Sequence, residues 1–378
     1  MPINATHAMF PDANQDEQSR QHFIRSFKVH IAGEIMPGNQ VLYRSRVVPK
    51  FLKEKSRQPK TRREVREALS VEPFNQMWSS LLRTSQEMLY DTVRPSIERQ
   101  LPELIERAKK KYSGKLGTLQ MDSSLEMPSY HTAVDIHCKP GAYHTAAGED
   151  DILAGAEFDR TLHLYFMGNA GPNNDDMGVS SGRFLRERFP NFRPKRILDM
   201  GCTIGHSTLP YVDHFPGAEV YALDVAGPCV RYGHHRAEAL GKKVHFSQQN
   251  AEHTSFPDGY FDLVVSHIML HETSTRGSRA IFKECHRLLR KGGIMMHVDG
   301  IGRKDPFEKY FAEWNAHYNA EPYLGTVQDE DFKDISVQAG FQAKDYFETG
   351  FASSYVTNSK RGEGKGFGAY YCVGAVKS

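Results

Sequence analysis

The sequence predicts an α/β protein, in which a mostly parallel sheet is flanked by helices and preceded by a mostly helical extension. Short apolar runs alternate with helical patterns over the second half of the 378-residue chain, as in parallel sheets that are covered on both faces. A glycine turn follows the first run, and residues 39–112 carry apolar side chains at helical spacing.

The first apolar run leads into a turn suited to ligand binding. The run ends at Leu198, Asp199 follows it, and Gly201 and Gly205 lie four residues apart before a segment that can begin a helix. Glycines let the backbone approach a ligand, and the free amides of a helix start attract a polar group. The sequence therefore predicts a site for an elongated polar cofactor at this turn.

The second apolar run closes with an acid. Asp224 stands nineteen residues beyond Gly205, where a carboxylate suits a bidentate grip on ribose hydroxyls. Further strands are expected at 244–247, 260–267 and 294–298. In such sheets a ligand lies across the carboxyl ends of the strands, so we expect the cofactor there.

In this order the motifs resemble a known family. They are Leu-Asp-x-Gly-Cys-x-x-Gly at 198–205, Leu-Asp at 223–224, Asn-Ala-Glu at 250–252, Phe-Pro-Asp-Gly-Tyr-Phe-Asp at 256–262 and Arg-Leu-Leu-Arg-Lys-Gly-Gly at 287–293. As a set they are similar to class I S-adenosylmethionine-dependent methyltransferases, most of all the small-molecule branch that includes the ubiquinone and menaquinone biosynthesis enzymes. The resemblance is good over roughly 178–300, looser over 301–378, and covers nothing before about residue 150.

The resemblance implies a fold and an activity. The fold is a Rossmann-like, seven-stranded sheet whose last strand is antiparallel, flanked by helices. The activity is transfer of a methyl group from S-adenosyl-L-methionine to a small-molecule metabolite, at an oxygen, nitrogen, sulfur or carbon atom. Because the sulfonium donor is already activated, such an enzyme mainly aligns donor and acceptor, which explains a strong cofactor signature beside a weak catalytic one.

The resemblance also implies roles for single residues. Asp199 would hold the amino-acid end of the cofactor, Asp224 the ribose, and Asn250 with Ala251 would frame the adenine. Thr203 replaces a frequent middle glycine of the family motif, and Asn250 replaces a frequent acid, so the adenine contact there would be an amide or backbone one. The full predicted cofactor-binding set is Asp199, Gly201, Cys202, Thr203, Gly205, Asp224, Val225, Asn250, Ala251, Glu252 and Ser266.

Catalytic candidates follow the fourth expected strand. His267, His271 and Glu272 stand where substrate arrives in doubly wound sheets. A near-neutral imidazole could take a proton from an acceptor, and Glu272 could orient a histidine or bind a cationic substrate. A helix cap or a core hydrogen bond is the alternative role for either histidine.

The substrate-binding candidates are Tyr165, His144, Trp314 and Tyr323. Tyr165 lies shortly before the first expected strand, and Trp314 belongs to an aromatic-rich helical stretch that suits either a lid or a core. His137 and His144 are close in sequence, but their spacing fits no zinc pattern, so no metal site is predicted.

The chain is expected to comprise a flexible N-terminus at 1–20, a mostly helical substrate or lid region at 21–150, and an S-adenosylmethionine-binding methyltransferase domain at 151–378. Pro95 and Pro102 are expected to break the helical region into pieces. Five cysteines form no CxxC pair, which favours reduced thiols and a cytoplasmic location. No apolar run of about 18 residues occurs, so no membrane span is expected. The expected oligomeric state is monomer or homodimer.

The charge pattern bears on the partner. The net charge of +2 indicates no general preference for polyanions, although residues 44–66 carry ten basic and two acidic side chains. Such a strip could bind nucleic acid but is more typical of a solvated helix face. The Asn/Asp-Pro-Pro-aromatic tetrad expected of base methyltransferases is absent after the fourth strand. A small-molecule acceptor and no nucleic-acid partner are therefore predicted.

Three other functions are considered beside this one. A nucleic acid methyltransferase, acting on RNA for example, is the first alternative. An S-adenosylmethionine-binding enzyme of other chemistry, such as a cyclase or isomerase, is the second. An NAD-dependent oxidoreductase is disfavoured, because Gly201-x-x-x-Gly205 is not the Gly-x-Gly-x-x-Gly turn.

Overall fold

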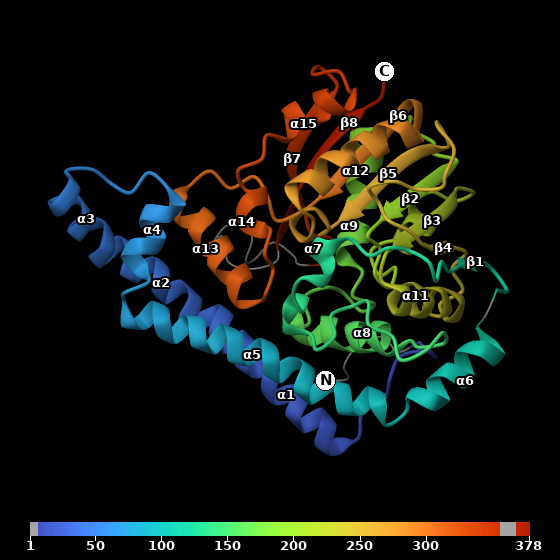
Figure 1. Ribbon diagram of the computed structural model, residues 1–378, viewed down its shortest axis with the longest axis horizontal. Helices are drawn as coiled ribbons and strands as arrows, with labels where there is room; N and C mark the ends of the chain where they lie inside the picture. Colours follow the sequence, from blue (N-terminus) through green and yellow to red (C-terminus); the bar gives the residue numbers. More distant parts are fainter. Residues whose placement is uncertain (1–6, 113, 356–367) are drawn as a thin grey trace.

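The central sheet has the strand order β1-β4-β3-β2-β5-β6-β8-β7 (Figure 1). This computed structural model describes residues 7–112, 114–355 and 368–378. Neighbours from β1 to β6 are parallel, and β8 is antiparallel to both β6 and β7. The strands are β1 Thr118–Gln120, β2 Arg196–Met200, β3 Glu219–Asp224, β4 His245–Gln248, β5 Phe261–His267, β6 Leu289–Val298, β7 Tyr346–Ala352 and β8 Ala369–Val376. The predicted α/β class and the antiparallel last strand are confirmed.

The predicted number of seven strands is wrong by one, because the described residues form eight. The additional strand, β1, pairs in parallel with the edge strand β4, with Thr118 opposite His245. Three residues carry no readable periodicity, so sequence patterns could not reveal this strand. β1 covers the backbone groups that β4 would otherwise present at an open edge.

Helices cover both faces of the sheet, which explains why its strands read as continuous apolar runs. On one face Leu185, Tyr211 and Val230 pack in a single core cluster with the strands. On the other face Phe282 and Ile335 do the same. The helices that supply these side chains are α9 Asp176–Arg188, α10 Pro210–His214, α11 Gly227–Ala239, α12 Thr275–Leu288 and α15 Phe332–Ala339.

The N-terminal region forms an elongated helical arm that lies along the domain (Figure 1). Val65 and Leu69 of this arm pack in one cluster with Phe307 and Tyr310 of α13, so the arm is joined to the domain through α13. Single π-helical turns at Ile31–Ile35 and Tyr43–Val47 join its first helices. The helices of the N-terminal region are α1 Gln15–His30, α2 Met36–Leu42, α3 Val48–Lys55, α4 Arg62–Leu69, α5 Pro73–Glu98 and α6 Leu101–Lys111. Two helices later in the chain are α8 Leu153–Tyr165 and α13 Pro306–Tyr318.

The two prolines of this region behave differently. Pro102 stands at the start of α6, as its fixed backbone angle favours. The prediction for Pro95 is wrong, because α5 continues through it to Glu98. Pro95 lacks the N–H that would donate to the carbonyl four residues earlier, but the helix ends at Glu98, within one turn of it. None of the helices in the described ranges has the length and apolarity to cross a bilayer.

The first described residues pack against the domain, although the sequence predicts a flexible segment at 1–20. Met9 and Phe10 are buried, and α1 begins at Gln15 with a capping box between Asn14 and Glu17. A capping box satisfies two backbone donors of the first helical turn, a feature the polar composition concealed. Residues 1–6 lie outside the described residues.

Candidate active site

A cavity of about 670 Å³ lies at the carboxyl ends of the strands. Gly201, Thr203 and Asp224 line it from the domain, whereas Tyr90 and His137 line it from the region before the domain. Ligands of open α/β sheets bind at this end of the strands, and pockets of such volume accommodate small ligands. The cavity is therefore the candidate active site, and both parts of the chain build it.

The wall on the sheet side is the glycine turn predicted to bind the cofactor. Gly201 has a φ of +70°, and a Cβ there would lie 2.7 Å from Sδ of Met269. The backbone N–H groups of Thr203 and Ala226 donate to the two oxygens of Asp224 at 2.8 and 2.9 Å. Burial raises the pKa of Asp224. This carboxylate thus fixes the turn after β2 against the end of β3 while it faces the cavity.

The cavity wall contains part of the predicted cofactor set. Six of its residues line the cavity, namely Gly201, Thr203, Asp224, Val225, Asn250 and Ala251. Sequence reasoning missed their neighbours Leu223, Gln249, Ile268 and Met269, which also line it. Only adjacency to the motifs could have indicated these four residues.

The remaining five residues of that set are not among the lining residues. Asp199 is buried and accepts a hydrogen bond from Thr208 Oγ1 at 2.5 Å. Ser266 lies 2.7 Å from Nδ1 of His297 in the core, and Glu252 accepts from the Tyr130 hydroxyl at 2.8 Å. Cys202 is buried, and the side of Gly205 is filled by Phe246. These residues shape the turn and its support rather than the wall itself.

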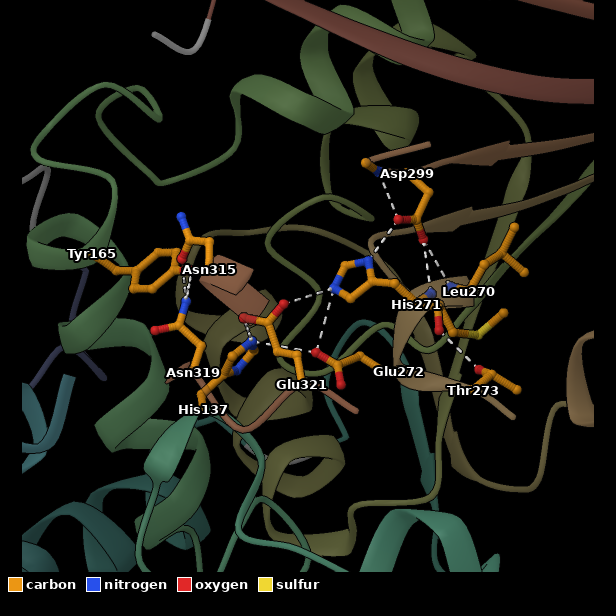
Figure 2. A network of polar contacts seen from close by, with 12 residues as sticks. His137, Tyr165, Leu270, His271, Glu272, Thr273, Asp299, Asn315, Asn319 and Glu321 are labelled. Carbon is orange, nitrogen blue, oxygen red and sulfur yellow. Dashed lines mark hydrogen bonds and ion pairs between the residues drawn. The ribbon is translucent and has the colours of Figure 1, made fainter. Parts of the chain in front are cut away.

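A cluster of imidazoles and carboxylates lines another part of the cavity (Figure 2). Nε2 of His137 lies 3.3 Å from an oxygen of Glu272 and 3.3 Å from an oxygen of Glu321. Nε2 of His271 lies 3.4 Å from Glu272 and 3.9 Å from Glu321. Four side chains from three segments therefore converge, and one ligand atom each of His137, Glu272 and Glu321 lies within 4.8 Å of the others.

Two further groups hold the histidines from behind. Nδ1 of His271 lies 2.6 Å from Asp299 Oδ1, and Nδ1 of His137 lies 2.5 Å from the Tyr143 hydroxyl. Sequence reasoning singled out His271 and Glu272 but missed the roles of His137 and Glu321. The histidine-rich stretch around residue 137 was the only signal for the first, and nothing in the sequence marked the second.

The electrostatics of the cluster oppose the predicted role of His271 as a general base. Burial disfavours its charge, yet the carboxylates of Asp299 and Glu272 raise its pKa well above the ordinary value. Burial acts likewise on His137, but Glu321 and Glu272 raise its pKa. The two ring nitrogens of His271 lie 2.6 Å from Asp299 and 3.4 Å from Glu272, so both already have carboxylate partners. His271 in this arrangement is a partner of carboxylates rather than a free base.

His267, the other candidate base, is held at both ring nitrogens. Its Nδ1 lies 3.2 Å from Asp199 and its Nε2 lies 3.2 Å from the Tyr211 hydroxyl. The side chain is one of the lining residues of the cavity, although little of its surface is exposed. The core hydrogen bond, which was the alternative role for this histidine, is the one that the structure shows.

Among the predicted substrate-binding residues, only Tyr165 lines the cavity. Its hydroxyl accepts from Nδ2 of Asn319 at 3.4 Å (Figure 2). Trp314 instead donates from Nε1 to Ser79 of α5 at 2.8 Å, so its helix packs against the arm. Tyr323 stands behind Tyr130, with ring centroids 5.9 Å apart. The ring of His144, the fourth candidate, is tilted against that of His131 with centroids 5.6 Å apart, and His144 is not a lining residue.

Comparison with known proteins agrees with the motifs. Residues 197–293 match the family model described as "Methyltransferase domain". The segment from β2 into β6, which carries the turn and Asp224, is thus similar to methyltransferase domains. The resemblance to class I S-adenosylmethionine-dependent methyltransferases is confirmed over this segment.

Individual relatives match the same part of the chain. A demethylmenaquinone methyltransferase of Thermus thermophilus is 36% identical over 106 residues, 28% of this chain and 47% of the relative. A malonyl-[acyl-carrier protein] O-methyltransferase of Legionella pneumophila is 25% identical, over 42% of this chain and 52% of the relative. A solved phosphoethanolamine N-methyltransferase 2 of Haemonchus contortus has a TM-score of 0.42 and 16% identity, covering 62% of this chain and 60% of the other. This chain spans about half the length of the curated relatives it matches.

Proposed function

We propose that this protein is an enzyme that transfers the methyl group of S-adenosyl-L-methionine to a small-molecule acceptor. The observation that carries the proposal is the position of the cavity, which is lined both by the turn in the segment that matches the methyltransferase model and by a polar cluster. The donor lies along Gly201, Thr203 and Asp224, with the adenine beside Asn250. The acceptor occupies the part lined by Tyr165 and the polar cluster.

The chemistry suits a site of this kind. Methyl transfer from a sulfonium is a direct displacement, so alignment of donor and acceptor supplies most of the acceleration, up to about 7–11 kcal/mol. A general base adds about 10²–10⁴-fold only when the acceptor must lose a proton. His267 and His271 already have carboxylate partners, Asp199 and Asp299. This is compatible with an enzyme that relies mainly on alignment and less on a general base.

The basic strip gives no support to a nucleic acid methyltransferase. Arg62 and Arg66 pair with Glu313 of α13, and Arg57 pairs with Glu64 at 2.5 Å. Side chains already engaged in ion pairs are less available to neutralise phosphates. The strip joins the helical arm to the domain, and a small acceptor is the better proposal.

A cytoplasmic location is proposed with the activity. All five cysteines are free and buried, as expected of a protein that is kept reduced. Analysis of the methylated product identifies the accepting atom. The molecular mass in solution distinguishes a monomer from a homodimer.

The test is binding followed by turnover. The full chain is titrated by calorimetry with S-adenosylmethionine, S-adenosylhomocysteine and NAD, and is then incubated with methyl-labelled donor and a metabolite extract. We expect binding of the two adenosyl compounds but not of NAD, and transfer of label to a small molecule. Transfer that depends on added RNA would contradict the proposal, as would no binding at millimolar concentration.

A further inference from the structure

The polar cluster in the cavity has the composition of a metal site. Two imidazoles and two carboxylates, from His137, His271, Glu272 and Glu321, face one another (Figure 2). They come from η3 Ile136–Cys138, from η4 Leu270–Glu272 and from the segment after α13. Nitrogen and oxygen donors of this kind bind divalent zinc, iron and manganese.

The spacing within the cluster is compatible with that of metal ligands. Charged hydrogen bonds between nitrogen and oxygen measure about 2.7–2.9 Å. Ligand atoms about 2.0–2.2 Å from a tetrahedral ion lie about 3.3–3.6 Å apart. Three of the four separations, 3.3, 3.3 and 3.4 Å, lie in this range, whereas the fourth, 3.9 Å, joins Nε2 of His271 to the second oxygen of Glu321. The same His271 makes a short 2.6 Å contact to Asp299 on its other nitrogen, so only the inward-facing atoms are held apart.

The outer partners also fit a metal site. A metal-binding imidazole usually has its second nitrogen bound to a carboxylate or another fixed group, which sets the tautomer and aims the ring. Asp299 does this for His271, and the Tyr143 hydroxyl does it for His137. Asp299 is itself fixed by the backbone N–H groups of Leu270 and Gly300 at 2.8 and 2.6 Å.

Together with Asp299, the cluster contains more carboxylates than imidazoles. Glu272, Glu321 and Asp299 supply three carboxylates, and Asp299 and Glu321 are at least nine-tenths buried. The ion pairs that the described residues form with these carboxylates involve only His137 and His271, without lysine or arginine. Buried carboxylates are stable only when they are paired or bound to a metal.

We propose that His137, His271, Glu272 and Glu321 bind one divalent transition-metal ion in the acceptor part of the cavity. The inference deepens the proposed function, because an ion that takes one ligand beyond these four side chains can bind an oxygen atom of the acceptor. An oxygen-bearing acceptor is then polarised by the ion, a Lewis-acid task that needs no free imidazole. The acceptor class is a small molecule with a carboxylate, carbonyl or hydroxyl group.

The test measures metal binding directly. The full chain is freed of metal with a chelator and titrated with Co²⁺, whose visible absorption reports its coordination, and bound metal is counted by mass spectrometry. We expect one Co²⁺ per chain and its displacement by Zn²⁺, which binds nitrogen and oxygen sites more tightly. Absence of Co²⁺ and Zn²⁺ binding by the wild-type chain would overturn the proposal.

Variants assign the ion to the cluster. The double variant Glu272→Gln, Glu321→Gln is expected to lower Co²⁺ affinity by more than about 100-fold, since loss of outer partners alone costs about 10–100-fold. His144→Gln removes a nearby histidine outside the cluster and should retain wild-type affinity. Unchanged affinity in the double variant overturns the assignment. Should circular dichroism show that variant unfolded, His137→Gln and Glu321→Gln singly must each lose at least about tenfold.

The two proposals fail separately. Binding of S-adenosylhomocysteine without binding of Co²⁺ or Zn²⁺ would reject the metal site and leave methyl transfer standing. Stoichiometric Co²⁺ binding without any affinity for adenosyl compounds would reject methyl transfer and retain the metal site.

Discussion

Asp299 and His271 form a 2.6 Å contact on the side of the imidazole that faces away from Glu272. Because the carboxylate takes Nδ1, the ring presents Nε2 to the two glutamates. Tyr143 and His137 repeat this relation at 2.5 Å. The orientation of both rings therefore depends on groups that do not themselves reach the centre of the cluster.

The outer partner of His137 can be removed with little change in volume. Tyr143→Phe deletes only the hydroxyl that holds Nδ1, so we expect Co²⁺ affinity to fall by about 10–100-fold while the fold is kept. Titration of absorbance measures this loss. Tyr346→Phe on β7 removes a hydroxyl bonded to Glu348 and should leave the affinity unchanged. Equal affinities in the two variants would contradict the proposed role of Tyr143.

Asp224 is predicted to bind the ribose of the donor. Asp224→Asn keeps the shape but halves the acceptor oxygens and removes the charge, and we expect a rise of at least about tenfold in Kd for S-adenosylhomocysteine, equivalent to about 1.4 kcal/mol. Calorimetry measures this rise. Asp213→Asn, on α10 and paired with Lys242, serves as control. An unchanged Kd in Asp224→Asn would reject the ribose assignment.

Gly201 offers a test of the turn itself. At its φ of +70° an alanine is strained by about 1–2 kcal/mol, and its Cβ would approach Met269 at the cavity wall. We expect Gly201→Ala to weaken binding of S-adenosylmethionine by about tenfold or more. Gly217 has a φ of +86°, and no atom lies within 4 Å of the position that a Cβ would take there, so Gly217→Ala imposes similar strain away from the cavity. Its binding should equal that of the wild type, and a comparable loss there would contradict the explanation.

His297 predicts part of the pH dependence of stability. Burial lowers its pKa to about 3, so the unfolded chain takes up a proton below about pH 6.5 that the folded chain refuses. The contribution of His297 to the free energy of unfolding is therefore complete above this pH and falls as the pH decreases, by about 1–2 kcal/mol between pH 7 and 5. Urea denaturation at both values measures the change. His297→Asn should lessen the dependence by this amount, and an identical slope in the variant would refute the argument.

A buried charge network ties the start of the chain to the domain. Asp159 contacts His7 at 2.9 Å, Arg236 at 3.1 Å and the Tyr232 hydroxyl at 3.0 Å. Asp159→Asn leaves Arg236 with an uncompensated buried charge, so we expect a loss of about 3–5 kcal/mol in the free energy of unfolding. Asp150→Asn, which breaks an exposed pair with Lys109, should leave the unfolding midpoint unchanged. Equal midpoints for both variants would show that the network contributes nothing.

The features that the sequence predicted correctly, the buried strands and the glycine turn, each depend on a short continuous stretch of residues. Parallel strands buried on both faces need long apolar runs, and the turn from Asp199 to Gly205 has the strand, turn and helix within a dozen residues. β1 escaped because three residues at an edge show no pattern. The flexible start predicted at 1–20 was inferred from polar composition. Composition does not reveal that two apolar side chains within this stretch, Met9 and Phe10, are buried.

The acceptor side could not be read in the same way. His137, Glu272 and Glu321 stand far apart in the chain and meet only because η3, η4 and the segment after α13 lie at one cavity. Local spacing therefore gave no metal pattern around residue 137. Trp314 and Tyr323 were chosen for their aromatic character, but helix periodicity does not say which neighbour a face meets, and Trp314 meets Ser79.

Because β1 pairs with β4, the sheet of the domain includes residues from before residue 151, and no sharp domain boundary exists there. A fragment excised at residue 151 would lose both this border of the sheet and the loop that carries His137. If such a fragment were fused to another protein, we would expect it to keep the residues proposed to bind the methyl donor and to lack part of the residues proposed to select the acceptor.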